Sequence, residues 1–189
     1  MLDWLLTLDG GVLLWIQAHL RAPVLDCAVS FYTTLGNAGA LFLAAAALML
    51  CFKKTRKAGI TALLALAIGF VCTNLILKHL VSRPRPWLEV AGLTALVTEN
   101  DPNSFPSGHT TAAFAFACAL WRTAPEKWMK GAALACAVLM AFSRLYVGVH
   151  YPSDVLTGVA VGLLAGWLAC LLWRQVPAWR RLEPPCQQG

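Results

Sequence analysis

Residues 143–154, SRLYVGVHYPSD, join two of the most apolar segments of the chain. They place Arg144, His150 and Asp154 where one hydrophobic run ends and the next begins. Ionisable side chains at membrane depth are costly and usually functional. Two membrane helices joined by this short turn would therefore bring three ionisable groups to one surface of the bilayer.

The composition of the whole chain supports a membrane protein. Of its 189 residues, 59% are hydrophobic and 13% are charged, and the mean hydropathy is +0.64. Soluble domains carry about 25% charged residues. The apolar runs are continuous and rich in Leu and Ala, which favours helices over the alternating pattern of a barrel.

Two other classes of protein fit the sequence poorly. The seven cysteines are scattered and form no CxxC pair, which argues against a disulfide framework or a zinc site. The net charge of +6 is not gathered in a basic stripe on a polar domain, so we expect no nucleic-acid partner.

We expect one all-α domain over residues 1–189, a polytopic membrane helical bundle of about five to six transmembrane helices. Residues 1–23 carry spaced polar residues together with Trp4 and Trp15, which is typical of a helix lying in the interface; a weak span over 1–20 is the alternative. Membrane spans need about 20 residues. The expected spans lie within 24–52 and at about 58–77, 107–121, 129–147 and 153–173, followed by a polar, frayed tail over 174–189.

The cations divide between the two sides of this topology. Ten of the fifteen Lys and Arg lie in the linkers 53–57 and 122–130 and in the tail 174–189. Five spans put these three regions on one side, which the positive-inside rule makes cytoplasmic. The other five cations fall on or near the opposite side and need a different reason, such as an anionic ligand; they are Arg21, Lys78, Arg83, Arg85 and Arg144.

His150 and Asp154 are four residues apart, and Pro152 suits the first turn of a helix. The carboxylate can therefore reach back to the imidazole and fix its tautomer. This arrangement is typical of a nucleophilic or basic histidine. The alternative is an ordinary acidic residue in a helix first turn, where it meets the helix dipole.

PSGH at 106–109 is a second polar cluster, at the start of the third expected span. Ser107 is a good N-cap, and Gly108 would let an anion approach the free N–H groups of the helix start. His109 then lies one residue inside that anion site. The alternatives are a plain cap for Ser107 and a structural role for His109.

The outer cations favour phosphate as the anion. The prolines of RPRP at 83–86 restrict Arg85, whose guanidinium can bind phosphate through two bonds, while Lys78 would act as a point charge. The alternatives are that RPRP is only a stiff polar linker and that the Arg144 side chain extends to the membrane interface, as long basic side chains often do. Two His and one Asp could bind a metal, but the neighbouring cations would repel it. No nucleotide motif is present, so we expect neither metal nor cofactor.

Three segments carry a family resemblance. KHLVSRPRP (78–86), PSGH (106–109) and SRLYVGVHYPSD (143–154) resemble the three ordered motifs of the type-2 phosphatidic acid phosphatase superfamily, K-x6-R-P, PSGH and S-R-x5-H-x3-D. The resemblance implies that His150 is the nucleophile, that Asp154 orients it and that His109 is the general acid. It implies that the phosphate is held by Lys78, Arg85, Ser107, the Gly108 amide and Arg144, without a metal. Arg83 lies outside the motif and is only a possible helper.

The short chain and its opening LDCAVSFYTTLGNAG (25–39) are similar to bacterial undecaprenyl-diphosphatases. This resemblance implies conversion of undecaprenyl diphosphate to undecaprenyl phosphate and phosphate, in the bacterial cytoplasmic membrane with the active site on the extracytoplasmic side. The alternatives are a phosphatidylglycerophosphate or phosphatidic acid phosphatase, a lipid phosphotransferase, and a non-enzymatic lipid-phosphate binder. The sequence does not indicate an oligomeric state.

Overall fold

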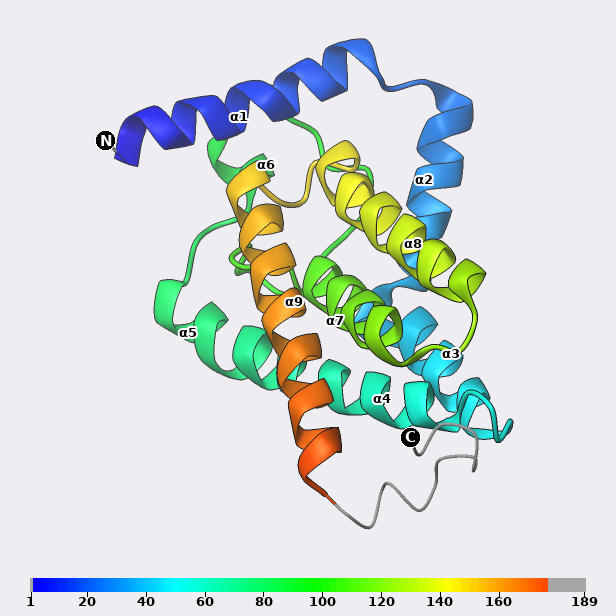
Figure 1. Ribbon diagram of the computed structural model, residues 1–189. Helices are drawn as coiled ribbons and strands as arrows, with labels where there is room; N and C mark the ends of the chain where they lie inside the picture. The colour runs from blue at the N-terminus through cyan, green and yellow to red at the C-terminus, as the bar shows by residue number, and fades with distance from the viewer. Residues whose placement is uncertain (1, 177–189) are drawn as a thin grey trace.

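A computed structural model describes residues 2–176, and within them the fold is all-α, as expected (Figure 1). No strand occurs in this range; Pro84 and Asn103 form one isolated bridge. Residues 177–189 of the predicted frayed tail lie outside the described residues. The elements are α1 (Leu2–His19), α2 (Pro23–Leu35), the 3-10 helix η1 (Asn37–Gly39), α3 (Ala40–Leu50), α4 (Arg56–Phe70), the π-helix η2 (Val71–Leu77), α5 (Lys78–Val81), α6 (Pro86–Glu89), α7 (Gly108–Thr123), α8 (Lys127–Tyr146) and α9 (Pro152–Gln175).

The apolar helices match the expected spans closely in position and loosely in number. Among the described residues, three helices are long and apolar enough to cross a bilayer: Arg56–Val81, Lys127–Tyr146 and Pro152–Gln175. Helices α2 and α3 make a fourth span if the pair, bent by 50°, crosses as one unit. Helix α7 covers the remaining expected span but has only 16 residues, fewer than the roughly 20 that a lipid-exposed span needs.

Helix α7 is the central helix of the bundle. It packs against α4, α8 and α9 (Figure 1), and its buried face is rich in alanine. Helix α9 approaches it through glycines spaced four residues apart: a Cβ atom on Gly162 would lie 2.6 Å from the Thr111 carbonyl oxygen, and one on Gly166 would lie 2.5 Å from Cys118 Cβ. Small residues at this spacing allow two membrane helices to touch along their backbones.

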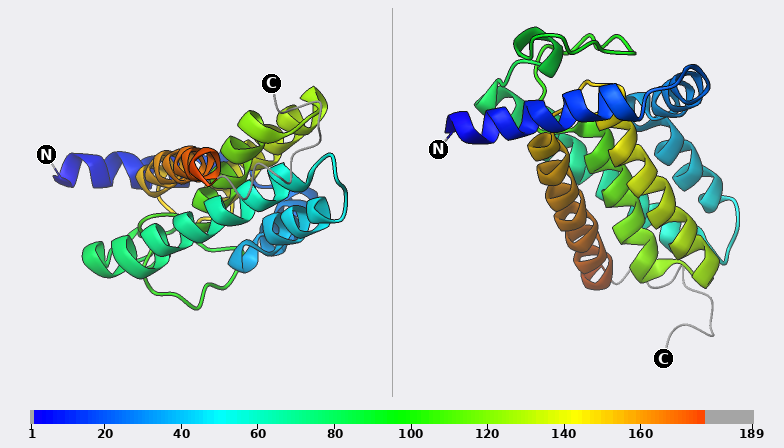
Figure 2. Two further views of the ribbon diagram at one scale, coloured as in Figure 1. Left: turned by 60° about the horizontal axis from the view of Figure 1, so that its bottom comes forward. Right: turned by 90° about the horizontal axis from the view of Figure 1, so that it is seen from above.

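Helix α1 lies across one end of the bundle (Figures 1 and 2). Its buried Asp9, Leu13 and Ile16 face the other helices, while Val12 and Trp15 are exposed. The α3–α4 turn, the α7–α8 turn and the end of α9 lie at the opposite end (Figure 2, right). The cation-rich linkers 53–57 and 122–130 therefore share one end of the bundle, whereas the location of α1 in a membrane interface stays a prediction.

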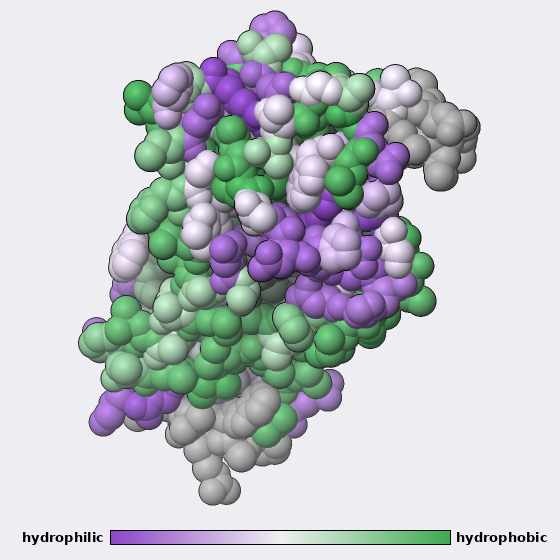
Figure 3. Space-filling view, turned by 180° about the vertical axis from the view of Figure 1, so that it is seen from behind, coloured by the Kyte–Doolittle hydropathy of each residue, from purple (hydrophilic) through white to green (hydrophobic). Residues whose placement is uncertain are grey.

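The surface has the pattern of a membrane protein. On the face opposite to that of Figure 1, a broad apolar zone lies below a band of hydrophilic residues (Figure 3). Large apolar side chains are exposed on the spanning helices, among them Leu48, Phe70, Leu139, Leu156 and Leu164. Exposed apolar surface of this extent fits contact with lipid.

The turn between α8 and α9 requires a glycine. Gly148 has φ +77°, and a Cβ atom there would lie 2.9 Å from Arg21 Nη2 and 3.1 Å from the Thr94 carbonyl oxygen. Arg21 also donates to the Tyr146 carbonyl oxygen at 3.1 Å. The structure thus accounts for one of the five cations outside the linkers and the tail, since Arg21 satisfies the C-terminal end of α8.

Candidate active site

The three motifs, far apart in the sequence, meet around one cavity of about 310 Å³. Its polar wall includes Lys78, Arg85, Glu99, His109 and His150. The remainder of the wall is largely apolar, with side chains from α3 and α4: Leu43, Leu63, Leu66, Ala67 and Phe70. The cavity therefore offers both a cationic end and an apolar end, and both imidazoles line it, as the topology predicted.

His150 lies in the α8–α9 turn and is 2% exposed. Its Nε2 atom is 3.1 Å from Arg85 Nη1. A guanidinium can only donate, so Nε2 is the acceptor and the ring proton is on Nδ1. Burial, followed by the charges of Arg85, Arg144 and Lys78, holds the pKa of His150 well below its ordinary value of 6.5. At neutral pH the side chain is thus an uncharged imidazole with its lone pair on Nε2.

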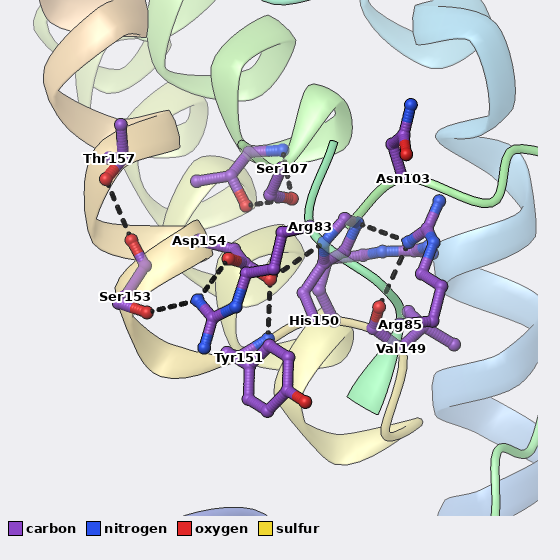
Figure 4. A network of polar contacts seen from close by, with 12 residues as sticks. Arg83, Arg85, Asn103, Ser107, Val149, His150, Tyr151, Ser153, Asp154 and Thr157 are labelled. Atoms are coloured by element: carbon purple, nitrogen blue, oxygen red, sulfur yellow. Dashed lines mark hydrogen bonds and ion pairs between the residues drawn. The ribbon is translucent and has the colours of Figure 1, made fainter. Parts of the chain in front are cut away.

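Asp154, in the first turn of α9, serves both the helix and the histidine. Its Oδ2 atom accepts from the Tyr151 amide at 2.9 Å, which is a capping bond, and lies 3.7 Å from His150 Nδ1. Its Oδ1 atom accepts from Arg83 Nη1 at 2.8 Å (Figure 4). The carboxylate therefore faces the protonated ring nitrogen at ion-pair distance, although the separation is longer than a hydrogen bond.

Arg85 is the most firmly held cation of the cavity. It is 1% exposed, and besides His150 it donates through Nε to the Asp101 carbonyl oxygen at 3.0 Å and through Nη1 to the Val149 carbonyl oxygen at 3.0 Å. Lys78 follows the π-helix η2 and forms an ion pair with the Asp101 side chain. Burial would raise the pKa of Asp101, but hydrogen bonds from Lys78 and the Asn103 amide lower it on balance.

Arg144 lies behind the cavity wall. The side chain is fully buried, donates to Thr33 Oγ1 at 2.6 Å and forms an ion pair with Glu99. Glu99 in turn lines the cavity and lies 3.8 Å from Arg85 Nη2. Glu99 therefore lies between Arg144 and the cavity. Arg144 can make its predicted contact with phosphate only if the Glu99 carboxylate moves.

Ser107 is buried, and its hydroxyl caps α7 by accepting from the Thr110 amide at 3.4 Å and the Thr110 hydroxyl at 2.9 Å. Its own amide donates to the Asp154 carbonyl oxygen at 3.1 Å, which ties the start of α7 to α9. Gly108, next along the chain, lines the cavity. Of these two predicted phosphate ligands, only the glycine lies on the cavity wall.

His109 pairs with a residue that the sequence did not single out. Its Nε2 atom lies 3.0 Å from Asn37 Oδ1 in η1. An amide oxygen only accepts, so with this amide orientation His109 carries a proton on Nε2. The sequence holds one clue to Asn37: it is a polar residue between two apolar segments.

Glu99, Asp101 and Asp9 were also missed. Glu99 and Asp101 lie in the loop between α6 and α7, and Asp9 lies on α1, so no local pattern joins them to the motifs. Only a weak pattern in the sequence points to them: they are acidic residues on the side of the membrane where the expected topology places the five remaining cations. The structure shows that each of the three pairs with a cation of the site or its surroundings.

The chain is similar to known proteins in both sequence and structure. The chain is 38% identical over 125 residues to the undecaprenyl-diphosphatase of Sulfolobus acidocaldarius, covering 66% of this chain and 58% of that protein. It is 34% identical over 113 residues to a putative undecaprenyl-diphosphatase of Escherichia coli strain K12, covering 59% and 54%. The chain thus spans little more than half the length of these relatives.

Two solved structures share the fold. The PAP2-type phosphatidylglycerolphosphate phosphatase of Bacillus subtilis superposes with a TM-score of 0.72 at 28% identity, covering 90% of this chain and 86% of that one. Aquifex aeolicus LpxE gives a TM-score of 0.71 at 27% identity, covering 80% and 88%. The model of the PAP2 superfamily matches residues 58–180, a range that contains all three motifs, and the chain therefore belongs to the PAP2 superfamily.

Proposed function

We propose that this protein is an integral membrane lipid phosphatase that works through a phosphohistidine at His150. One observation carries the proposal: an uncharged imidazole presents its Nε2 lone pair beside Arg85 in a cavity that Lys78 and His109 also line. Splitting hydrolysis into two displacements suits a histidine nucleophile.

In the proposed first step, His150 Nε2 attacks phosphorus and the bond from phosphorus to the leaving oxygen breaks. His109, which begins this step as an imidazolium with a proton on each ring nitrogen, gives one proton to that oxygen and becomes neutral. In the second step, His109 takes a proton from water, the water oxygen attacks phosphorus, and the bond to His150 breaks to release phosphate. Arg85 and Lys78 stabilise the charge on the phosphoryl oxygens in both steps. Asp154 stabilises the Nδ1 proton of His150 as the ring becomes positive.

The apolar end of the cavity supports a lipid substrate. Leu43, Leu63 and Phe70 come from helices α3 and α4, and Phe70 is exposed on the outside of the bundle. A phosphate in the cationic end would leave its hydrocarbon tail beside these side chains. We propose undecaprenyl diphosphate as the substrate because the Sulfolobus relative is named an undecaprenyl-diphosphatase and the Escherichia coli relative a putative one.

Phosphatidylglycerophosphate is the second candidate. The solved phosphatase with that name shares the fold over 90% of this chain. The same phosphohistidine could also pass its phosphate to an alcohol, which would make the protein a phosphotransferase.

We place the cavity on the extracytoplasmic side of the cytoplasmic membrane. The cation-rich linkers 53–57 and 122–130 support this, since they lie at the end of the bundle away from α1 (Figure 2). We also propose that no metal takes part. Cations surround the candidate ligands, and within residues 2–176 no three His, Cys, Asp or Glu side chains are grouped to hold a metal ion.

Phosphate release from a panel of lipids tests these proposals together. Purified protein in detergent with EDTA is given undecaprenyl diphosphate, phosphatidylglycerophosphate or phosphatidic acid, and a His150→Ala variant is the control. We expect release by the wild-type protein, fastest with undecaprenyl diphosphate, and none by the variant. Release that needs added metal, or that survives in His150→Ala, contradicts the mechanism; a faster rate on phosphatidylglycerophosphate favours the second candidate.

A further inference from the structure

A chain of charged groups connects the N-terminal helix to the candidate nucleophile; Figure 4 shows its members Arg83, Asp154 and His150. Asp9 on α1 pairs with Arg83 Nη2 at 2.9 Å, and Arg83 Nη1 pairs with Asp154 Oδ1 at 2.8 Å. Asp154 Oδ2 then faces His150 Nδ1 at 3.7 Å. Asp9 precedes the region 58–180 that the family model matches, so the comparison assigns it no role.

Arg83 is fixed by more than its two ion pairs. Nη1 also donates to the Ser153 hydroxyl at 2.7 Å, and the guanidinium carbon lies 3.7 Å from the centre of the Tyr151 ring, a cation–π contact. Asp9 also accepts from the Ser153 amide at 3.2 Å. One planar guanidinium therefore bridges two carboxylates, which the single ammonium of a lysine cannot reproduce in the same geometry.

This arrangement sets the orientation of Asp154. Its side chain is fully buried, with Oδ1 held by Arg83 and Oδ2 held by the Tyr151 amide. Oδ2 is thereby left facing His150. Without Arg83 the carboxylate would lose its only ion pair with an arginine among the described residues, and Oδ1 would be free to turn. Without Asp9, Arg83 would pair with Asp154 alone, and the carboxylate would then attract the Nδ1 proton of His150 less strongly.

We propose that Arg83 and Asp9 are positioning residues for the nucleophile, acting through Asp154, and that α1 is thereby part of the catalytic unit. The proposal rests on the phosphatase function proposed above. Its chemistry adds no step: the two residues hold the carboxylate that supports the Nδ1 proton while His150 attacks phosphorus.

The test compares phosphate release by wild-type protein, Asp9→Asn, Arg83→Lys and Asp154→Asn in detergent. Asp26→Asn is the matched control, because it makes the same chemical change on α2, where Asp26 accepts from the Tyr146 hydroxyl outside the site. Because the phosphate-binding side chains are untouched, we expect Asp9→Asn and Arg83→Lys to lower kcat between about 10-fold and 100-fold with little change in KM. Asp26→Asn should match the wild-type rate.

Combining the changes separates positioning from folding. If Asp9 and Arg83 act through Asp154, neither change should lower kcat further in the Asp154→Asn background, because residues that act as one unit are non-additive. A wild-type kcat for Asp9→Asn, or a loss that is undiminished in Asp154→Asn, overturns the proposal while leaving the phosphatase function intact. Arg83→Lys decides the question if Asp9→Asn does not fold, and a wild-type protein that releases no phosphate overturns both proposals.

Discussion

Nη1 of Arg85 donates a hydrogen bond to Nε2 of His150 at 3.1 Å, so the Arg85 guanidinium occupies the lone pair of the candidate nucleophile. A phosphate oxygen is a stronger acceptor for a guanidinium than a neutral ring nitrogen. A phosphate entering the cavity would therefore draw Arg85 away from His150 and expose the lone pair as it binds. Binding of the anion and activation of the nucleophile become one event.

The pH profile should reflect the cations around His150. Burial and the charges of Arg85, Arg144 and Lys78 lower the pKa of His150, and only the neutral ring attacks. The acidic limb of kcat/KM should therefore lie below pH 6.5. Arg85→Gln removes one of these charges, raises the pKa of His150 and should move that limb to higher pH. A limb that stays in place in Arg85→Gln would show that another group sets it.

His109 should matter in proportion to the basicity of the leaving oxygen. His109→Ala removes the proposed proton donor, so release from a lipid phosphate should fall by about 100-fold or more. A nitrophenyl phosphate, whose leaving oxygen needs little protonation, should be affected far less. Parallel rate measurements on both substrates check this, with His150→Ala as a control that loses both activities. Equal losses in His109→Ala on the two substrates would contradict a general-acid role.

Glu99 should compete with phosphate for the cations, because it pairs with Arg144 and lies 3.8 Å from Arg85. Glu99→Gln weakens a bond to a buried guanidinium, so the free energy of unfolding should fall by about 1.5–3 kcal/mol in phosphate-free buffer. Added inorganic phosphate should then raise the Tm of the variant more than that of the wild-type protein. Equal shifts in Tm would mean that the Glu99 carboxylate does not compete with phosphate for Arg85 and Arg144.

The contact between α7 and α9 should tolerate no side chain at Gly162. A Cβ atom there would lie 2.6 Å from the Thr111 carbonyl oxygen and 2.8 Å from Phe114 Cβ, so Gly162→Ala must separate the helices that carry His109 and Asp154. We expect a loss of about 1–3 kcal/mol in the free energy of unfolding and reduced kcat.

Gly131→Ala on α8 is the matched control for Gly162→Ala, because nothing lies within 4 Å of the added atom and alanine favours a helix. Its Tm should equal or exceed that of the wild-type protein. A Gly162→Ala protein with unchanged Tm and kcat would show that the close contact is not required.

The sequence predicts those parts of the site that depend on local pattern. His150 with Asp154, the capped start at Ser107 and Arg85 between two prolines are all set within a few residues of the chain. Asn37, Glu99 and Asp9 escaped prediction because tertiary packing alone brings their loops and helices to the motifs. The same reason accounts for Arg144 and Ser107, whose placement behind the cavity wall depends on Glu99 and on the cap of α7.

The fold, like the site, is predictable where local sequence pattern determines it and not where tertiary packing does. Hydropathy alone locates α4, α8 and α9, whose long apolar runs face lipid. It does not predict that α7 is the central helix of the bundle, or that the chain from residue 71 to residue 77 forms a π-helix before Lys78. Both involve neighbours distant in the sequence: α7 packs against the glycines of α9, and Lys78 pairs with Asp101 in the loop between α6 and α7.

Rapid quenching of the reaction is the most direct test of the central claim. Wild-type protein is mixed with a lipid phosphate labelled at the transferred phosphorus, quenched at high pH to preserve phosphohistidine, and digested for peptide mapping. We expect a transient, acid-labile label on the peptide that contains His150, and no label in His150→Ala. A wild-type protein that releases phosphate without ever carrying the label, or that carries it on another residue, would contradict the account.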